Sequence, residues 1–255
     1  MIGILEPTEG AKSVVSSESG LIFSIQQSIR KILTNYTSIT SQFDSKSHFV
    51  NRFFYSLGVN GPKDVFLVKW MDFSSKYGIG YLLSNGSSGF YFNDGTSLIL
   101  SSNKSRGHFF QPGEENKKIL VRESFIADNP KEVVRHKLEI MLKFDGFLQV
   151  PTTSYSNHTS PNDTNSELIF VVKFFRTSQA TFFSLSHRVL QVNFFDHCKL
   201  IFCDEGRMIF FIDQEKRCLI FPFSISRVHL PSAISSKLQY VSDIFNNMMK
   251  SSAVN

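Results

Sequence analysis

The chain has 255 residues, of which 42% are hydrophobic, and this is enough to fill a core and to exclude an intrinsically disordered protein. Its net charge of +5 comes from 27 basic residues scattered among 22 acidic ones, so no stripe of the kind that binds nucleic acid is evident. Three cysteines without metal-ligand spacing, no signal-peptide pattern and no apolar run of about 18 residues indicate an intracellular protein without a membrane partner.

The N-terminal part of the chain changes character near residue 20. Residues 1–20 are rich in Ser, Glu and Gly, and we expect them to be mobile. Apolar residues then recur at helical spacing from Ile22 to Tyr36, which predicts an amphipathic helix with one face for covering another surface. A polar stretch and a cluster of Phe and Tyr at residues 49–55 follow, and a first module begins after them at residue 61.

This first module, residues 61–150, contains short β-prone runs divided by turn residues such as Asn93-Asp94-Gly95. We predict six strands, at residues 66–70, 78–83, 89–93, 96–101, 108–110 and 118–122. Apolar residues at helical spacing then predict a helix over residues 130–149.

A second module repeats this plan after a linker at residues 151–167, which is rich in Ser, Thr, Asn and Pro. We predict its strands at residues 168–175, 181–185, 189–195, 199–203, 208–212 and 218–223, and its helix over residues 232–249. The predicted class is therefore α+β, with two antiparallel sheets that are each followed by a helix. Two such modules are expected to pack as a pseudo-symmetric pair, with a ligand site in the cleft between them.

The two modules also share sequence, and they differ at one informative point. The residues after a shared aspartate are Gly95, Thr96 and Ser97 in the first copy, but His197, Cys198 and Lys199 in the second. His197 and Lys199 lie two apart at the start of a predicted strand, so we expect their side chains to share one face as two donors for a phosphate. An ordinary solvated strand end is the alternative.

The sequence carries no pattern typical of an enzyme. Seven dispersed histidines form no metal motif, Gly78-Ile79-Gly80 lacks the third glycine of a nucleotide loop, and Phe144-Asp145-Gly146 is not the metal-binding motif of a kinase. We therefore expect a protein that is not a catalyst in this chain and that needs neither metal nor cofactor. Trp70, the only tryptophan, is either a large core residue or an aromatic wall for a bound peptide.

Two longer stretches resemble the polo boxes of polo-like serine/threonine kinases. Residues 69–81 with 92–96 resemble the first box and residues 191–201 the second, and the predicted helix at residues 22–36 is placed like the polo cap. The resemblance, which covers residues 60–250, implies a capped pair of tandem boxes, each a six-stranded antiparallel sheet with a C-terminal helix. The expected domains are the N-terminus with the cap (1–60), polo box 1 (61–150), the linker (151–167) and polo box 2 (168–255).

In this family the two boxes clamp a phosphorylated Ser-phosphoSer or Ser-phosphoThr segment. The resemblance implies that His197 and Lys199 bind the phosphate. It also implies a set of residues that bind the peptide, namely Trp70, Met71, Asp72, Phe73, Leu142 and Asn193. Trp70 would contact the residue before the phosphate, Asn193 would support the site, and Leu142 would offer backbone hydrogen bonds. The helix end at Asp145-Gly146 and the short turn before His197 depart from the family pattern.

The resemblance implies a targeting module that docks onto phosphorylated mitotic partners and localises or regulates a polo-like kinase activity. The expected places are the cytoplasm or nucleus, and the spindle pole or centrosome and the kinetochore in mitosis. A kinase domain in cis or in trans is a further expected partner. Two alternatives stay open, namely a phosphate-independent scaffold or dimerisation module and the non-catalytic part of a polo-like kinase.

Overall fold

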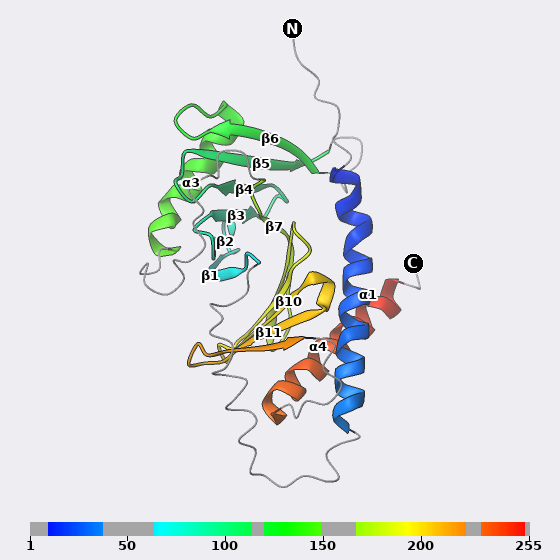
Figure 1. Ribbon diagram of the computed structural model, residues 1–255. Helices are drawn as coiled ribbons and strands as arrows, with labels where there is room; N and C mark the ends of the chain where they lie inside the picture. Colours follow the sequence, from blue (N-terminus) through cyan, green and yellow to red (C-terminus); the bar gives the residue numbers. More distant parts are fainter. Residues whose placement is uncertain (1–9, 38–63, 114–119, 149–166, 223–230, 253–255) are drawn as a thin grey trace. The chain divides into compact units, whose positions relative to one another are not determined.

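A computed structural model describes residues 10–37, 64–113, 120–148, 167–222 and 231–252 (Figure 1). These residues divide into two compact units. The first contains residues 10–16, 64–113, 120–148, 167–174 and 183–187, and the second contains residues 17–37, 175–182, 188–222 and 231–252. The Phe/Tyr cluster at residues 49–55 and all but the last residue of the predicted linker lie outside the described residues.

The first sheet has six antiparallel strands that follow one another in chain order. They are β1 (Leu67–Phe73), β2 (Gly78–Leu83), β3 (Ser88–Phe92), β4 (Ser97–Leu100), β5 (Arg106–Pro112) and β6 (Leu120–Ile126). Each strand is hydrogen-bonded to the next one along the chain, so the sheet needs no crossover connection. The helix α3 (Glu132–Leu148) follows the sheet, as the sequence predicted.

One face of this sheet packs on α3. The strand register places Phe90, Leu98 and Phe109 side by side on that face. They form a buried cluster with Val134, Leu138 and Met141, which recur at helical spacing along α3. The opposite face carries the alternate residues of each strand.

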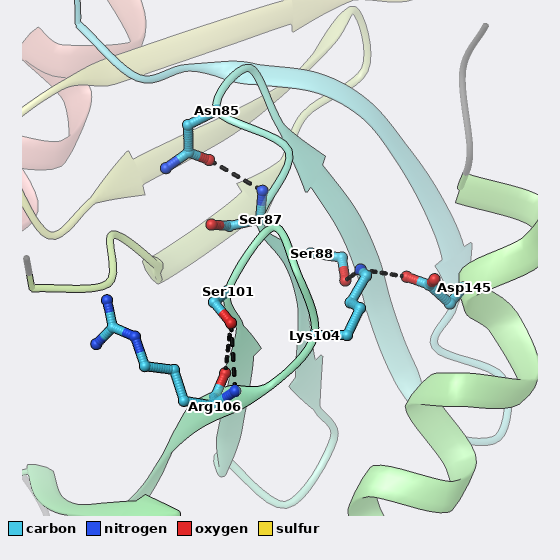
Figure 2. A network of polar contacts seen from close by, with 7 residues as sticks. All are labelled: Asn85, Ser87, Ser88, Ser101, Lys104, Arg106 and Asp145. Atoms are coloured by element: carbon cyan, nitrogen blue, oxygen red, sulfur yellow. Dashed lines mark hydrogen bonds and ion pairs between the residues drawn. The ribbon is translucent and has the colours of Figure 1, made fainter. Parts of the chain in front are cut away.

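A polar network holds the last turns of α3 against this sheet (Figure 2). Lys104, in the turn between β4 and β5, donates hydrogen bonds to the Ser88 hydroxyl and to the Asp145 carboxylate, the latter at 2.8 Å. Asp145 lies near the C-terminal end of α3, where the helix dipole disfavours a negative charge, and the ammonium group of Lys104 compensates for this unfavourable interaction. The departure from the family pattern at Asp145 thus has a structural partner in Lys104.

The second sheet repeats the first in chain order. Its strands are β7 (Val171–Arg176), β8 (Ala180–Leu185), β9 (Leu190–Phe194), β10 (Lys199–Cys203), β11 (Met208–Ile212) and β12 (Cys218–Pro222). A 3-10 turn, η3 (Asp204–Gly206), joins β10 to β11, and α4 (Ser232–Ser252) ends the described chain.

Two helices pack on one face of the second sheet, α4 and α1 (Gly10–Thr37). Ile25 and Ile29 of α1 and Phe245 of α4 are fully buried in the same cluster as Phe202 of β10. At Gly206 a Cβ atom would lie 3.0 Å from the Cα of Ile25, and the backbone is left-handed (φ = +86°), so only glycine fits there without strain. The helix expected to cover a surface therefore packs on box 2.

The fold class and most elements match the prediction, and the differences have physical reasons. The bounds of β2, β10 and β11 are those predicted, because turn residues flank each strand. The helix predicted at residues 22–36 begins earlier, at Gly10, because no proline interrupts the chain from there to Thr37. The last strand of the first sheet lies at Leu120–Ile126 rather than at 118–122, because an exposed edge strand lacks a clear apolar alternation.

Candidate functional site

His197 lies in the turn between β9 and β10, not in a strand. Strand β10 begins only at Lys199, and His197 has a left-handed backbone with φ = +69°. We predicted from strand alternation that His197 and Lys199 share one face, and this argument is wrong because His197 does not lie in a strand. The imidazole is exposed, and its direction is set by the turn.

The equivalent turn of the first sheet shows how this conformation arises. Gly95 occupies the same place between β3 and β4 with φ = +82°, and its N–H donates to the Phe92 carbonyl at 3.0 Å. The N–H of His197 donates in the same way to Phe194, also at 3.0 Å. Both turns thus have one shape, which glycine adopts freely and histidine does not.

A left-handed backbone costs an L-residue about 1–2 kcal/mol, and glycine avoids that cost. The second copy nevertheless carries His197 where the first carries Gly95. Four other described residues that are not glycine also have positive φ, namely Lys104, Arg188, Asp204 and Lys216, so the conformation alone does not mark a binding site. His197 differs from its counterpart Gly95 in carrying an exposed imidazole two residues from a lysine, and this makes it a candidate binding residue.

Lys199 is the first residue of β10 and pairs with Asn193 of β9 and Ile212 of β11. Burial, with the nearby charge of Lys216, lowers the pKa of Lys199 to about 8. A partly desolvated ammonium group gains more than an exposed one from an anion at hydrogen-bond distance. Its surroundings therefore favour binding of a phosphate oxygen.

Asn193 lies directly opposite Lys199 in the register, so the two side chains share a face of the sheet. This face is opposite to the one that packs on α1 and α4, because Val192 and Leu200 belong to that cluster. Asn193 is buried, and its Oδ1 atom accepts a hydrogen bond of 2.8 Å from Gln191. Gln191, which the sequence did not single out, orients the amide that is expected to support the site.

Trp70 is half-buried on β1, the edge strand of the first sheet. Its ring meets the ring of Phe183 edge-on, with centroids 5.5 Å apart. The residue is therefore neither fully in a core nor fully exposed. This position fits an aromatic side chain that is held on one side and offers its other side to a ligand.

The residues after Trp70 alternate across the sheet. Asp72 lies on the face of Trp70, where its carboxylate accepts a hydrogen bond of 2.9 Å from the N–H of Ser74. Met71 and Phe73 lie on the other face, and the Phe73 ring contacts that of Phe144 of α3, with centroids 4.0 Å apart and the ring planes tilted by 31°. The peptide contacts assigned to Met71, Asp72 and Phe73 stay predictions, and only Asp72 shares the face of Trp70.

Leu142 projects from the middle of α3 and is 49% exposed. Its position inside the helix commits its backbone N–H and C=O to helical hydrogen bonds. The backbone contacts expected of Leu142 stay a prediction, but this placement favours a contact through its side chain. Lys69 contacts the C-terminal end of α3, where its ammonium group donates a hydrogen bond of 2.6 Å to the Phe147 carbonyl.

A lysine on each helix was missed by sequence reasoning. Lys137 of α3 forms an ion pair with Asp94, and Lys237 of α4 forms one with Asp196. The signal was present, because both copies place a lysine about 40 residues after the shared aspartate. A separation of this many residues in the sequence does not identify a contact unless the fold is known.

Other classes of site receive no support in the described ranges. No group of three or more His, Cys, Asp or Glu side chains there is arranged to hold a metal ion. No described helix is long and apolar enough to cross a membrane.

Comparison with known proteins identifies the family. The POLO box duplicated region matches the chain twice, at residues 75–138 and 177–238. The serine/threonine-protein kinase CCRP1 of Zea mays is 30% identical over 161 residues, which are 62% of this chain and 25% of that kinase. The chain thus corresponds to about a quarter of the length of this relative.

Solved structures show the same fold. The polo-box domain of budding yeast Cdc5 in complex with the Dbf4 polo-interacting region has a TM-score of 0.62 and 18% identity, over 92% of this chain and 89% of that one. The Cdc5 domain in complex with a Spc72 phosphopeptide has a TM-score of 0.57 and 19% identity, over 90% and 83%. With two matched boxes, two six-stranded sheets and a helix after each, the chain belongs to the polo-box family.

Proposed function

We propose that this chain binds phosphoserine- or phosphothreonine-containing segments of partner proteins and thereby localises or regulates a polo-like kinase activity. The observation that carries the proposal is the pair His197 and Lys199, which lies in the second box where the first has Gly95 and Ser97. An exposed imidazole two residues from a partly desolvated lysine suits a phosphate.

The chemistry of the two donors matches a phosphate group. A phosphomonoester carries a charge of about −1.5 to −2 at pH 7 and three strong acceptor oxygens. Lys199 offers up to three donors on a point charge, and the imidazole of His197 offers another N–H. Charge-assisted hydrogen bonds contribute about 1.5–3 kcal/mol each, a large share of the roughly 8 kcal/mol of a micromolar complex.

Sequence preference is assigned to the residues of the first box. Trp70 and Asp72 share one face of β1, and Leu142 offers an exposed side chain on α3. We propose that Trp70 contacts the residue before the phosphate and that Asn193 keeps Lys199 in place. The Cdc5 domain, which has the same fold, is in complex with a phosphopeptide, and this supports the proposal.

A phosphate-independent docking module is the second candidate. Exposed apolar side chains at Ile126 of β6 and Val133 of α3, 66% and 65% accessible, favour it. Ile126 ends one element and Val133 lies near the start of the next, and a partner that covered them would bury apolar area.

The test is a calorimetric titration of the chain with a Ser-phosphoThr-Pro peptide and with its unphosphorylated twin. We expect micromolar binding confined to the phosphorylated peptide. Equal affinity for both peptides would contradict the phosphate-dependent function and favour the docking module. In cells, a tagged chain is expected at the spindle pole or kinetochore in mitosis, and the double variant H197G/K199M is expected to lose that position.

A further inference from the structure

Lys237 of α4 is tied to the turn that carries His197. Its ammonium group donates to Oδ2 of Asp196 and lies 4.3 Å from the centre of the Phe194 ring. The other carboxylate oxygen of Asp196 accepts a hydrogen bond of 3.1 Å from the N–H of Cys198. Lys237 is only 15% exposed, so this contact is held in place by the surrounding packing.

The first box contains the same arrangement. Lys137 of α3 binds Asp94 and lies 4.1 Å from the centre of the Phe92 ring. Oδ1 of Asp94 accepts from the N–H of Thr96 at 3.1 Å. Both lysines are the sixth residue of their helix, counting from Glu132 in α3 and from Ser232 in α4. The ion pair is therefore a common structural part of both boxes.

Its surroundings differ in one respect that matters for binding. In the first box the aspartate precedes Gly95, whereas in the second box Asp196 directly precedes His197 and lies three residues before Lys199. An unpaired carboxylate at that position would repel a phosphate bound by these residues. Burial pushes the pKa of Asp196 upward, but the hydrogen bonds from Lys237 and Cys198 outweigh it and hold the pKa below its ordinary value. Asp196 is thus ionised, and its charge has to be balanced.

We propose that Lys237 is a positioning residue for phosphate binding, which cancels the charge of Asp196 and fixes the turn that presents His197. The inference rests on the phosphopeptide-binding function proposed above. Lys137 makes the equivalent ion pair with Asp94 in the first box, which has no proposed phosphate-binding residue, so Lys137 only stabilises its turn. The two boxes therefore supply a matched pair of variants in one molecule.

The experiment compares Lys237→Met with Lys137→Met in the whole chain, using the phosphorylated peptide and its unphosphorylated twin. Both variants are expected to lower the thermal unfolding midpoint by similar amounts, because both remove the same contacts. Only Lys237→Met is expected to weaken binding of the phosphorylated peptide, by about tenfold, which corresponds to about 1.4 kcal/mol. Lys137→Met is expected to bind it within about twofold of the unchanged chain.

Two further variants separate charge from packing. Lys237→Arg keeps the charge and is expected to restore affinity to within about threefold. The double variant D196N/K237M keeps the acceptor for the Cys198 N–H but removes the carboxylate, and it is expected to recover most of the lost affinity. Failure of both variants to recover would overturn the charge-cancelling role.

The outcomes also separate this inference from the proposed function. If the unchanged chain binds only the phosphorylated peptide and Lys237→Met binds it equally well, the inference is overturned and the function stands. Equal losses in Lys237→Met and Lys137→Met would overturn it too, because they would show a general structural effect. If the unchanged chain does not distinguish the two peptides, the proposed function itself fails.

Discussion

At the scale of single residues, the comparison of His197 with Gly95 separates stability from function. Replacing His197 with glycine relieves a left-handed backbone worth about 1–2 kcal/mol but adds the chain entropy of glycine, about 0.5–1 kcal/mol. We therefore expect His197→Gly to leave the free energy of unfolding unchanged or to raise it by up to about 1.5 kcal/mol. The same variant is expected to lose most of its preference for phosphorylated peptide. Urea unfolding and calorimetric titration of one preparation measure both effects.

The matched control is Gly95→His in the first box. A Cβ atom there would meet only Pro112, at 3.7 Å, so backbone conformation is the main cost. We expect a loss of about 1–2 kcal/mol in the free energy of unfolding and no change in peptide affinity. A stability loss on His197→Gly equal to that on Gly95→His would show that His197 is there for structure.

Lys199 predicts how affinity depends on pH. Its pKa of about 8 means that it loses its proton as the pH rises through that value, and with it the charge that attracts phosphate. Affinity for the phosphorylated peptide is expected to fall between pH 7.5 and 9.5, because binding then requires uptake of a proton. Arginine stays charged in this range, so Lys199→Arg is expected to flatten the decline. An equally steep decline in Lys199→Arg would assign the pH dependence to another group.

At the scale of elements, Gly89 of β3 shows how closely the first sheet is packed. A Cβ atom there would lie 2.2 Å from Cζ of Tyr81, whose hydroxyl accepts a buried hydrogen bond of 3.0 Å from the N–H of Val171. Gly89→Ala must displace this ring and break the bond, so we expect a loss of about 3 kcal/mol in urea unfolding.

Gly146 of α3 is the control for this prediction. It has no neighbour within 4 Å of the position of a Cβ atom. Gly146→Ala is therefore expected to leave stability unchanged or to raise it by up to about 1 kcal/mol through helix propensity. A similar loss in both variants would contradict the packing argument.

The elements also show what the sequence predicts and what it does not. Strands such as β10 were located correctly because turn residues and apolar runs are local signals. The conformation of His197 was not predicted, because it becomes apparent only when the turn is compared with the equivalent turn at Gly95. The contact of Lys237 with Asp196 spans 41 positions, and no local pattern reports such a pair.

At the scale of the whole molecule, duplication explains why the site can be asymmetric. Each box repeats the same meander, the same turn and the same lysine–aspartate pair. In the function proposed above, the second unit supplies His197, Lys199 and Asn193 and the first supplies Trp70, Asp72 and Leu142, so phosphate-binding residues are needed in one copy only.

The central claim is that these two groups of residues bind one phosphorylated peptide. The direct measurement is a titration of the ¹⁵N-labelled chain with the Ser-phosphoThr-Pro peptide, followed by amide chemical shifts. We predict saturable shifts at residues 195–199 and at residues 69–73 with one common dissociation constant, and none of this size with the unphosphorylated twin. Shifts confined to one group, or equal shifts with both peptides, would contradict the account.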